Sequence, residues 1–478
     1  MKAHSPQVAL VFGVAALAAA SFGFAQSSAV FPRGEVIEKV VCEAQPSESY
    51  ALYLPSYFTP EKRWPILIAF EPLARGKMPV ELFRPAAEKY GYIVVSSNNS
   101  QNGPWEPQLE AAQAVWLDTH ARFPIDARRV YLAGFSGGAR LACAVGLRLK
   151  GQAAGVIAGG AGFPQGASEA PSKDLPFLYF GVIGIRDFNF SEMKELDRTL
   201  DRLGIVHRLE VFPGGHSWMP PEVALEAVEW MDIQAMKAGT REKDPGLIES
   251  LFESRLRQAQ DLGKSGDLAG AYQRYEWCQA DFDGLRDVAE VRSKVAQMKS
   301  SKEVAKALKR EASRERRIAS LERDLWGRFQ ERMDALESGE GNWMDVHVLI
   351  QRARESLPKP HDAAAEAKDE SIAAERFVLG LMVLNYEKAR DALAAKDFSR
   401  ARENLRLAVQ CAPESGFMYF QLARACVLSN RTKEALEALE KSFEKGFAGL
   451  GGIDKDPDFE TLRNTREFQE LLTRFGKK

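Results

Sequence analysis

The 478-residue sequence is longer than one ordinary folded core, so its length predicts two or three domains. With 45% hydrophobic and 27% charged residues, its composition is that of a globular protein. The formal net charge is −2 and no long block of one sign occurs, which disfavours binding to nucleic acid or to an anionic membrane surface, because both need clustered Lys and Arg.

The N-terminus has the features of a secretory signal peptide. An apolar or small-residue run, Val8 to Ala20, is followed by the small residues that signal peptidase requires, so we expect cleavage before Gln26. Residues 1–25 are thus the predicted signal peptide, and the mature protein should be exported to the periplasm or the extracellular space without a transmembrane segment. A retained membrane anchor is the alternative, since the run approaches spanning length.

Between residues 30 and 240, short β-branched runs alternate with helical stretches, including Glu106–Arg122 and Asn189–Leu203. This alternation predicts an α/β fold, with a mostly parallel sheet and helices on both faces. Apolar runs are typical of central strands that are covered on both sides. Eight strands are expected, at Val36–Cys42, Tyr50–Leu54, Ile66–Phe70, Tyr92–Ser97, Val130–Ala133, Val156–Gly159, Phe177–Val182 and Arg208–Phe212.

After residue 245 the sequence is helix-forming throughout. A period of 34 resembles tetratricopeptide repeats, in which small residues let antiparallel helices pack closely and which suggest a protein partner. We expect a weak repeat and a long charged helix over 245–345, a helix and linker over 346–372, and repeats over 373–478. The repeated positions are Ala389, Ala401, Leu405 and Ala408, which recur as Ala423, Ala435, Leu439 and Ser442, with Ala259, Ala271 and Tyr275 as a weaker copy.

The five cysteines are scattered, without a CxxC pair or metal-ligand spacing. Buried free thiols are expected. A disulfide between Cys411 and Cys426 is the alternative, if their helices face each other.

The strongest chemical motif is Gly134-Phe-Ser136-Gly-Gly138, which matches G-x-S-x-G between a predicted strand and a predicted helix. In that context the serine lies on a sharp turn with its hydroxyl free, and the glycines are needed because side chains would clash there. Ser136 is the predicted nucleophile, and a glycine-rich structural turn is the alternative.

A serine hydroxyl needs an imidazole base to act as a nucleophile. In this type of fold the acid and then the histidine follow the serine in sequence. His120 precedes Ser136, and His207 begins a predicted strand that fixes it beside the sheet. His216 lies in the loop that leaves this strand, where an imidazole can reach the serine. We predict His216 as the base, with a structural loop histidine as the alternative.

Asp187 is the predicted acid of the site. It follows the seventh predicted strand and precedes the helix that starts near Asn189. Its carboxylate would orient the imidazole and stabilise the protonated form. Capping of that helix is the alternative role.

The predicted oxyanion hole has one clear donor, the N–H of Gly137. The second donor should come from the loop after Ile66–Phe70, where Pro72 has no N–H, so Glu71 or Leu73 must supply it. Loss of one such donor costs about 2.7–4 kcal/mol of transition-state stabilisation. A slow or specialised enzyme is therefore compatible with this loop.

Together with Glu48–Leu54, Gly184–Asp187 and Phe212–Trp218, the serine motif resembles the polyhydroxybutyrate depolymerase and feruloyl-esterase-like branch of the α/β-hydrolases, over roughly residues 36–236. The resemblance implies hydrolysis of a small-molecule or polymeric ester through an acyl-enzyme, with no metal or organic cofactor. Many relatives carry His-Gly where this chain has Glu71-Pro72, which puts the second oxyanion donor in doubt.

Three side chains are candidates for substrate binding. Trp105 and Trp218 would flank a groove, with core packing as the alternative, and Asn99 follows the fourth predicted strand, with turn formation as the alternative. The connection between the sixth and seventh predicted strands is too short for a large lid domain, which favours an open site.

Two other functions stay open. The departure at Glu71-Pro72 and the large repeat region favour a non-catalytic scaffold with a vestigial hydrolase domain. A serine peptidase would use the same three residues. The correct order of Ser136, Asp187 and His216 favours an ester hydrolase over the scaffold and leaves the peptidase open.

Overall fold

The computed structural model describes residues 31–164, 166, 170–357, 368–447, 453 and 456–475. The predicted signal peptide and most of the predicted linker lie outside these residues. Contacts divide the chain into two units, which are Met1–Ile185 with Phe190–Ala312, and Arg186–Asn189 with Ser313–Lys478.

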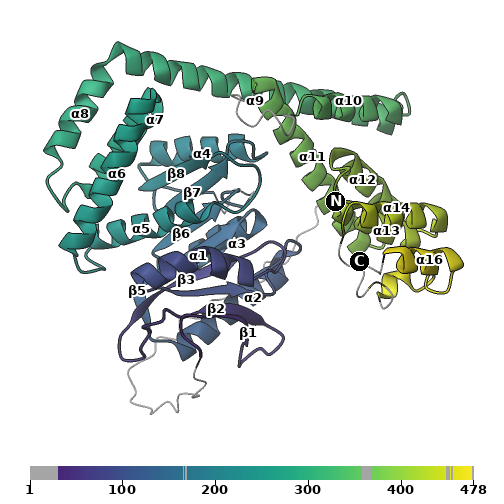
Figure 1. Cartoon of the computed structure of the whole chain (residues 1–478), viewed down its shortest axis with the longest axis horizontal. Helices are drawn as coiled ribbons and strands as arrows, with labels where there is room; N and C mark the ends of the chain where they lie inside the picture. The colour runs from purple at the N-terminus through teal and green to yellow at the C-terminus, as the bar shows by residue number, and fades with distance from the viewer. Residues whose placement is uncertain are drawn as a thin grey trace, which may run out of the picture. The chain divides into compact units, whose positions relative to one another are not determined.

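The first unit is built on one eight-stranded sheet with the order β1-β2-β4-β3-β5-β6-β7-β8 (Figure 1). β2 pairs antiparallel with β1 and β4, and β4, β3 and β5 to β8 form a parallel array. All eight predicted strands are confirmed. They are β1 (Val36–Val41), β2 (Ser49–Tyr53), β3 (Trp64–Phe70), β4 (Ile93–Ser97), β5 (Ile125–Phe135), β6 (Gly155–Gly159), β7 (Leu178–Gly184) and β8 (His207–Phe212).

Helices cover both faces of the sheet, as predicted. Ile66 and Ile68 of β3 belong to one core, with α2 (Trp105–Arg122), α3 (Gly137–Arg148) and α4 (Phe190–Leu203). Leu67 of the same strand belongs to the other core, with α1 (Lys77–Tyr90) and α5 (Pro221–Lys237). Side chains alternate across a strand, so β3 is buried at every position and is apolar throughout.

The first unit continues beyond the boundary expected at residues 240–245. Ile233 and Met236 of α5 share a buried cluster with Phe252 and Phe282, which lie on α6 (Pro245–Ser265) and α7 (Leu268–Phe282). α8 (Ala289–Ser300) and the start of α9 (Lys302–Ser338) complete the unit. Asp244, just before α6, accepts the Leu247 N–H at 3.0 Å and so caps the first turn of this helix.

Buried charges join the sheet to these additional helices. Arg208 of β8 pairs with Asp281 of α7 at 2.5 Å, and both side chains are almost fully buried. Asp281 also accepts hydrogen bonds from Trp230 Nε1 at 3.0 Å and Gln234 Nε2 at 3.3 Å, both on α5. One carboxylate therefore connects β8 and α5, the two elements that flank the loop containing His216.

The second unit is helical. It contains the rest of α9, then α10 (Trp343–Glu355), α11 (Asp369–Ala394), α12 (Phe398–Cys411), α13 (Gly416–Leu428), α14 (Thr432–Glu444), the 3-10 helix η2 (Pro457–Phe459) and α16 (Arg466–Phe475). The eight residues that recur at a period of 34 are all buried. They lie on α11 with α12 and on α13 with α14, so the repeat corresponds to two helix pairs. Their assignment as tetratricopeptide repeats stays a prediction.

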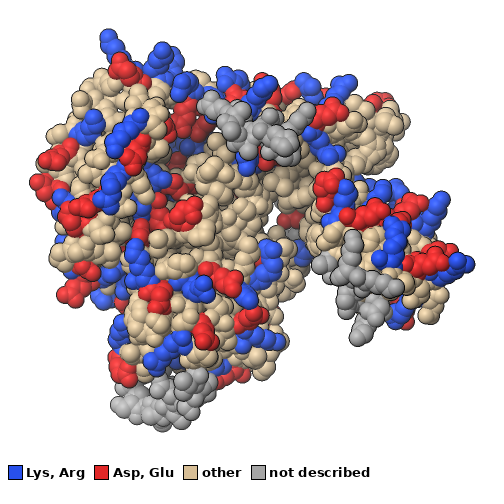
Figure 2. Space-filling model, in the orientation of Figure 1, with Lys and Arg blue, Asp and Glu red and all other residues tan. Residues whose placement is uncertain are grey.

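Lys and Arg side chains alternate with Asp and Glu over the face shown in Figure 2, as the near-zero net charge predicts. The five cysteines are buried free thiols. Among the helices described, none combines the length and the apolar character needed to cross a membrane.

Candidate active site

Ser136 lies on the sharp turn between β5 and α3. Its backbone has φ 53° and ψ −122°, a conformation that L side chains rarely adopt. A Cβ on Gly134 would lie 2.1 Å from the Gly138 carbonyl oxygen, and one on Gly138 would lie 2.2 Å from the Phe70 carbonyl oxygen. The two glycines are therefore required by close packing, and the turn presents the half-buried Ser136 hydroxyl at the carboxyl edge of the sheet.

His216 is brought to this hydroxyl by the loop after β8. Its Nε2 lies 2.9 Å from Ser136 Oγ, although 80 positions separate them in sequence. The imidazole packs against the ring of Phe135 at 4.6 Å between centroids. The loop approaches β7 closely, because a Cβ on Gly184 would lie 2.4 Å from the Gly215 carbonyl oxygen. The imidazole is thus held within proton-transfer distance of the serine.

Asp187 lies between β7 and α4, where the sequence placed it. Its side chain is fully buried, and Oδ1 accepts the Asn189 N–H at 2.9 Å. The residue before this segment, Ile185, donates its N–H to the Phe212 carbonyl oxygen at 2.9 Å. Phe212 ends β8, so the ends of the strands that lead to Asp187 and His216 are joined.

The other two histidines considered from sequence have structural contacts. His120 stacks on Trp116 at 4.0 Å between centroids, and burial lowers its pKa. His207 Nε2 lies 3.2 Å from Asp197 Oδ1. Burial opposes protonation of His207, but the bonds to Asp197 and Ile205 outweigh it and raise the pKa. His120 therefore stabilises α2, and His207 stabilises the packing of β8 against α4.

The loop after β3 shows which backbone groups face the serine turn. The Leu73 N–H is 2.7 Å from the carboxylate of Glu71, so the expectation that Leu73 donates to an oxyanion is corrected. The same carboxylate accepts the Arg75 N–H at 3.1 Å. The backbone N of Glu71 instead lies 3.4 Å from the position of a Cβ on Gly138. Glu71 therefore shapes its loop with its buried carboxylate and presents its N–H beside the helix that starts at Gly137.

The three predicted substrate-binding residues differ in position. Asn99 accepts the Ser49 N–H at 3.0 Å and donates to the Ser47 carbonyl oxygen at 3.2 Å, so it caps β2 and its expected substrate role is corrected. Trp218 is buried against Phe135 at 5.7 Å between centroids, so core packing is its role. Trp105, at the start of α2, is 38% exposed and stays a candidate.

Asn102 is the asparagine that lies at the serine turn. A Cβ on Gly137 would lie 1.9 Å from Asn102 Oδ1, so this amide packs directly on the first residue of α3. The Asn102 N–H donates to the Pro72 carbonyl oxygen at 2.8 Å, which ties its loop to the loop of Glu71. The sequence shows that Asn102 follows the fourth strand, but Asn99 does so too, so this position alone could not single out Asn102.

An ion pair that sequence reasoning missed supports the serine helix. Arg140 lies one turn after Ser136 on α3, and its guanidinium contacts both carboxylate oxygens of Glu192 on α4, at 2.9 and 2.8 Å. It also donates to the Phe163 carbonyl oxygen at 2.7 Å. This bidentate contact fixes the start of α3 relative to the start of α4.

The strand order and the strand–serine–helix turn define an α/β-hydrolase fold with a Ser–His pair at its carboxyl edge. Within the described part of the chain, no three His, Cys, Asp or Glu side chains gather as metal ligands. No protein-family model matches the chain, and no curated protein matches it in sequence.

Solved structures that resemble part of the chain include esterases and serine hydrolases. S-formylglutathione hydrolase of Staphylococcus aureus is 15% identical with a TM-score of 0.34, covering 42% of this chain and 99% of that protein. An esterase of Pyrobaculum calidifontis is 14% identical with a TM-score of 0.35, covering 43% and 86%. A ferulic acid esterase is 17% identical with a TM-score of 0.32, covering 41% and 94%. In each case the similarity extends over less than half of this chain.

Proposed function

We propose that the protein is an exported serine hydrolase that cleaves carboxylic esters through an acyl-enzyme. The observation that carries the proposal is the 2.9 Å distance between Ser136 Oγ and His216 Nε2, at a turn whose strained backbone exposes the hydroxyl. A structural turn has no need of a positive φ at a serine with an imidazole within hydrogen-bonding reach.

Ser136 Oγ attacks the ester carbonyl carbon while its proton passes to His216 Nε2. The protonated imidazole then gives this proton to the departing alcohol oxygen, which leaves the acyl group on Ser136. Water attacks the acyl-enzyme with His216 as base, and the carboxylic acid is released. In this second step His216 takes a proton from the water and gives it to Ser136 Oγ as the acid leaves, so the complete cycle restores the serine and the imidazole.

Asp187 is the residue we assign to orient His216. Two observations support this role: its carboxylate is fully buried, and it lies two positions after Ile185, whose N–H is bonded to the end of β8. Two residues of extended chain span at most about 7 Å, so Asp187 stays close to the loop that starts there. A carboxylate near the imidazole stabilises its protonated form.

The oxyanion donors that we assign are the N–H groups of Gly137 and Glu71. Gly137 is the first residue of α3, where N–H groups have no intrahelical acceptor and the helix dipole favours negative charge. Glu71-Pro72 stands where many relatives carry His-Gly. The Glu71 carboxylate accepts the N–H groups of Leu73 and Arg75 and so stabilises the loop. This observation weakens the case for a vestigial domain.

The ester class, the export and the protein partner are parts of the proposal that rest on sequence. The motif resemblance favours small-molecule or polymeric esters, residues 1–25 favour export to the periplasm or the extracellular space, and the buried 34-residue period favours a protein-binding role for the C-terminal helices. The chemistry requires no metal or cofactor.

The test is hydrolysis of short p-nitrophenyl esters by the full mature chain. We expect Ser136→Ala to lower kcat/KM at least about 10³-fold. Ser217→Ala is the matched control, because this neighbouring hydroxyl is exposed in the same loop as His216, and its kcat/KM should stay within about twofold of wild type.

Two results would contradict the proposal. Cleavage of unstructured peptides, with no turnover of any ester, would identify a peptidase. A folded wild-type protein that hydrolyses neither class would favour the non-catalytic scaffold.

A further inference from the structure

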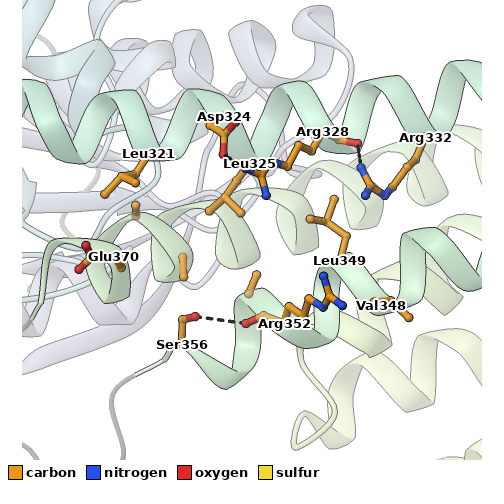
Figure 3. A pocket seen from close by; sticks show the side chains of 13 residues that line it. Leu321, Asp324, Leu325, Arg328, Arg332, Val348, Leu349, Arg352, Ser356 and Glu370 are labelled. Carbon is orange, nitrogen blue, oxygen red and sulfur yellow. Dashed lines mark hydrogen bonds and ion pairs between the residues drawn. The ribbon is translucent and has the colours of Figure 1, made fainter.

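Helices α9, α10 and α11 of the second unit line a cavity of about 230 Å³ that is partly open to solvent (Figure 3). α9 contributes a stripe of side chains that contains Leu321, Leu325, Arg328 and Arg332. Residues three or four positions apart lie on one face of a helix, so this stripe faces the cavity along its length. The face of α9 that lines the cavity therefore carries both apolar and charged side chains.

The cavity exists because α11 presents small side chains at this level. Ala373 and Ala374 line it and end at Cβ. One turn later, Phe377 packs against Trp326 at 5.1 Å and Phe329 at 6.2 Å between ring centroids, and the core is filled. Protein interiors are normally packed to high density. The unfilled space beside this aromatic core is therefore suited to a ligand.

Arg332 and Arg352 line the cavity without a carboxylate partner in the described part of the chain. Arg328, by contrast, pairs with Asp324 at 2.8 Å. Arg332 donates through Nη1 to the Arg328 carbonyl oxygen at 2.8 Å, while its Nε is buried without a hydrogen-bond partner. Among the described residues, no carboxylate forms an ion pair with Arg332, which is half-buried, or with Arg352, which is exposed on α10. A buried donor without a partner is unfavourable, so an acceptor brought by a ligand would stabilise the site.

The Asp324–Arg328 ion pair lies on the α9 wall of the cavity, and the other charged groups lie toward its two ends. Figure 3 shows Arg332 and Arg352 toward the end where Val348 and Leu349 lie, and Glu370 at the opposite end. A ligand whose negative group is at one end and whose apolar body fills the space along Leu325 matches this arrangement. A small multiply charged anion does not match it, because it would leave the apolar walls uncovered.

We propose that this cavity binds a carboxylic acid with a compact apolar body. The carboxylate accepts hydrogen bonds from Arg332 and Arg352, whose planar forks match its geometry, and the apolar part contacts Leu325, Leu349 and Ala374. The site goes beyond the proposed ester hydrolysis, because it contains none of the residues assigned to that reaction. An acid of this class is also what ester hydrolysis releases.

The test is isothermal titration calorimetry on the full mature chain with 4-phenylbutyrate. We expect one equivalent to bind with a Kd of about 1 mM or tighter, as suits a ligand of this size. The neutral analogue 4-phenylbutan-1-ol should bind at least about tenfold more weakly, because it cannot pair with the guanidinium groups. Inorganic phosphate should give no saturable heat.

Variants locate the site. Arg332→Gln and Arg352→Gln should each weaken binding at least about fivefold, and Ala374→Leu, which fills the space, at least about tenfold. Arg323→Gln is the matched control, because Arg323 is exposed on α9 outside the cavity, and its affinity should stay within about twofold of wild type. Thermal melting of each variant verifies that it is folded.

Several outcomes would overturn the proposal. They are the absence of binding, equal affinity for the alcohol, saturable phosphate binding of similar strength, and unchanged affinity in both arginine variants. The last would place the acid elsewhere, including the Ser136 site. If Ala374→Leu does not fold, the two arginine variants decide the question. Because catalysis is not measured, failure here would leave the ester hydrolase proposal untouched.

Discussion

Replacement of Asp281 by alanine is expected to destabilise the first unit by about 3–5 kcal/mol, because the buried Arg208 guanidinium loses its close carboxylate partner and keeps only Glu226, whose oxygen lies 3.8 Å away. Both side chains are only 3% exposed, so water cannot replace the lost contact. Trp230 Nε1 and Gln234 Nε2 lose an acceptor in the same variant. Folded domains are stable by about 5–15 kcal/mol, so the variant should lose a large part of its stability.

The assay is urea unfolding followed by tryptophan fluorescence, since Trp230 lies at the altered contact. Arg257→Ala is a suitable control: its ion pair with Glu253 at 3.2 Å is exposed, and its loss should change stability by less than about 0.5 kcal/mol. The double variant Arg208→Met, Asp281→Leu should be more stable than Asp281→Ala, because it leaves no unpaired guanidinium, whereas Trp230 Nε1 and Gln234 Nε2 lack their acceptor in both variants. A loss below about 1 kcal/mol in Asp281→Ala would refute the reasoning.

Three further predictions concern strain, pH and domain extent. Ser136→Gly should raise the free energy of unfolding by about 1 kcal/mol, because glycine adopts the positive φ without strain, whereas Ser136→Ala should not; equal melting temperatures would contradict this. Burial raises the pKa of Glu210 from 4.5 to about 7, so between these pH values the folded state binds a proton that the unfolded state has lost. The free energy of unfolding should therefore fall as the pH rises from 4.5 to 7. Glu210→Gln should flatten this fall, which melting curves at several pH values would measure. A fragment of residues 31–242 should be insoluble and one of residues 31–312 soluble, because the shorter fragment exposes Ile233 and Met236; equal solubility would place the boundary at 242.

Much of the fold could be predicted because it depends on short-range patterns. Strands buried on both faces are continuous apolar runs, and β3 and β4 were recognisable for this reason. The serine turn is recorded in consecutive glycines. The order of strand ends also brought His216 to Ser136 from far along the chain, since parallel strands end at one edge of a sheet.

Other features depend on contacts that no local pattern records. The end of the first domain was expected at residues 240–245 because strand character ends there, but Ile233 and Met236 are covered by α6 and α7, which follow that point. Asn99 and Asn102 are equivalent in sequence, and only the path of their loop determines which amide reaches Gly137. The sequence leaves the Leu73 N–H as a candidate oxyanion donor, because no local pattern shows that the Glu71 carboxylate accepts it.

The most direct test of the central claim is covalent labelling of the full mature chain with a fluorophosphonate, followed by peptide mass spectrometry. Activation of Ser136 by His216 predicts one adduct, on Ser136 Oγ, which is absent in Ser136→Ala and forms at least about 10²-fold more slowly in His216→Gln. An adduct on another serine, or a folded wild-type protein that takes up no label, would contradict the claim.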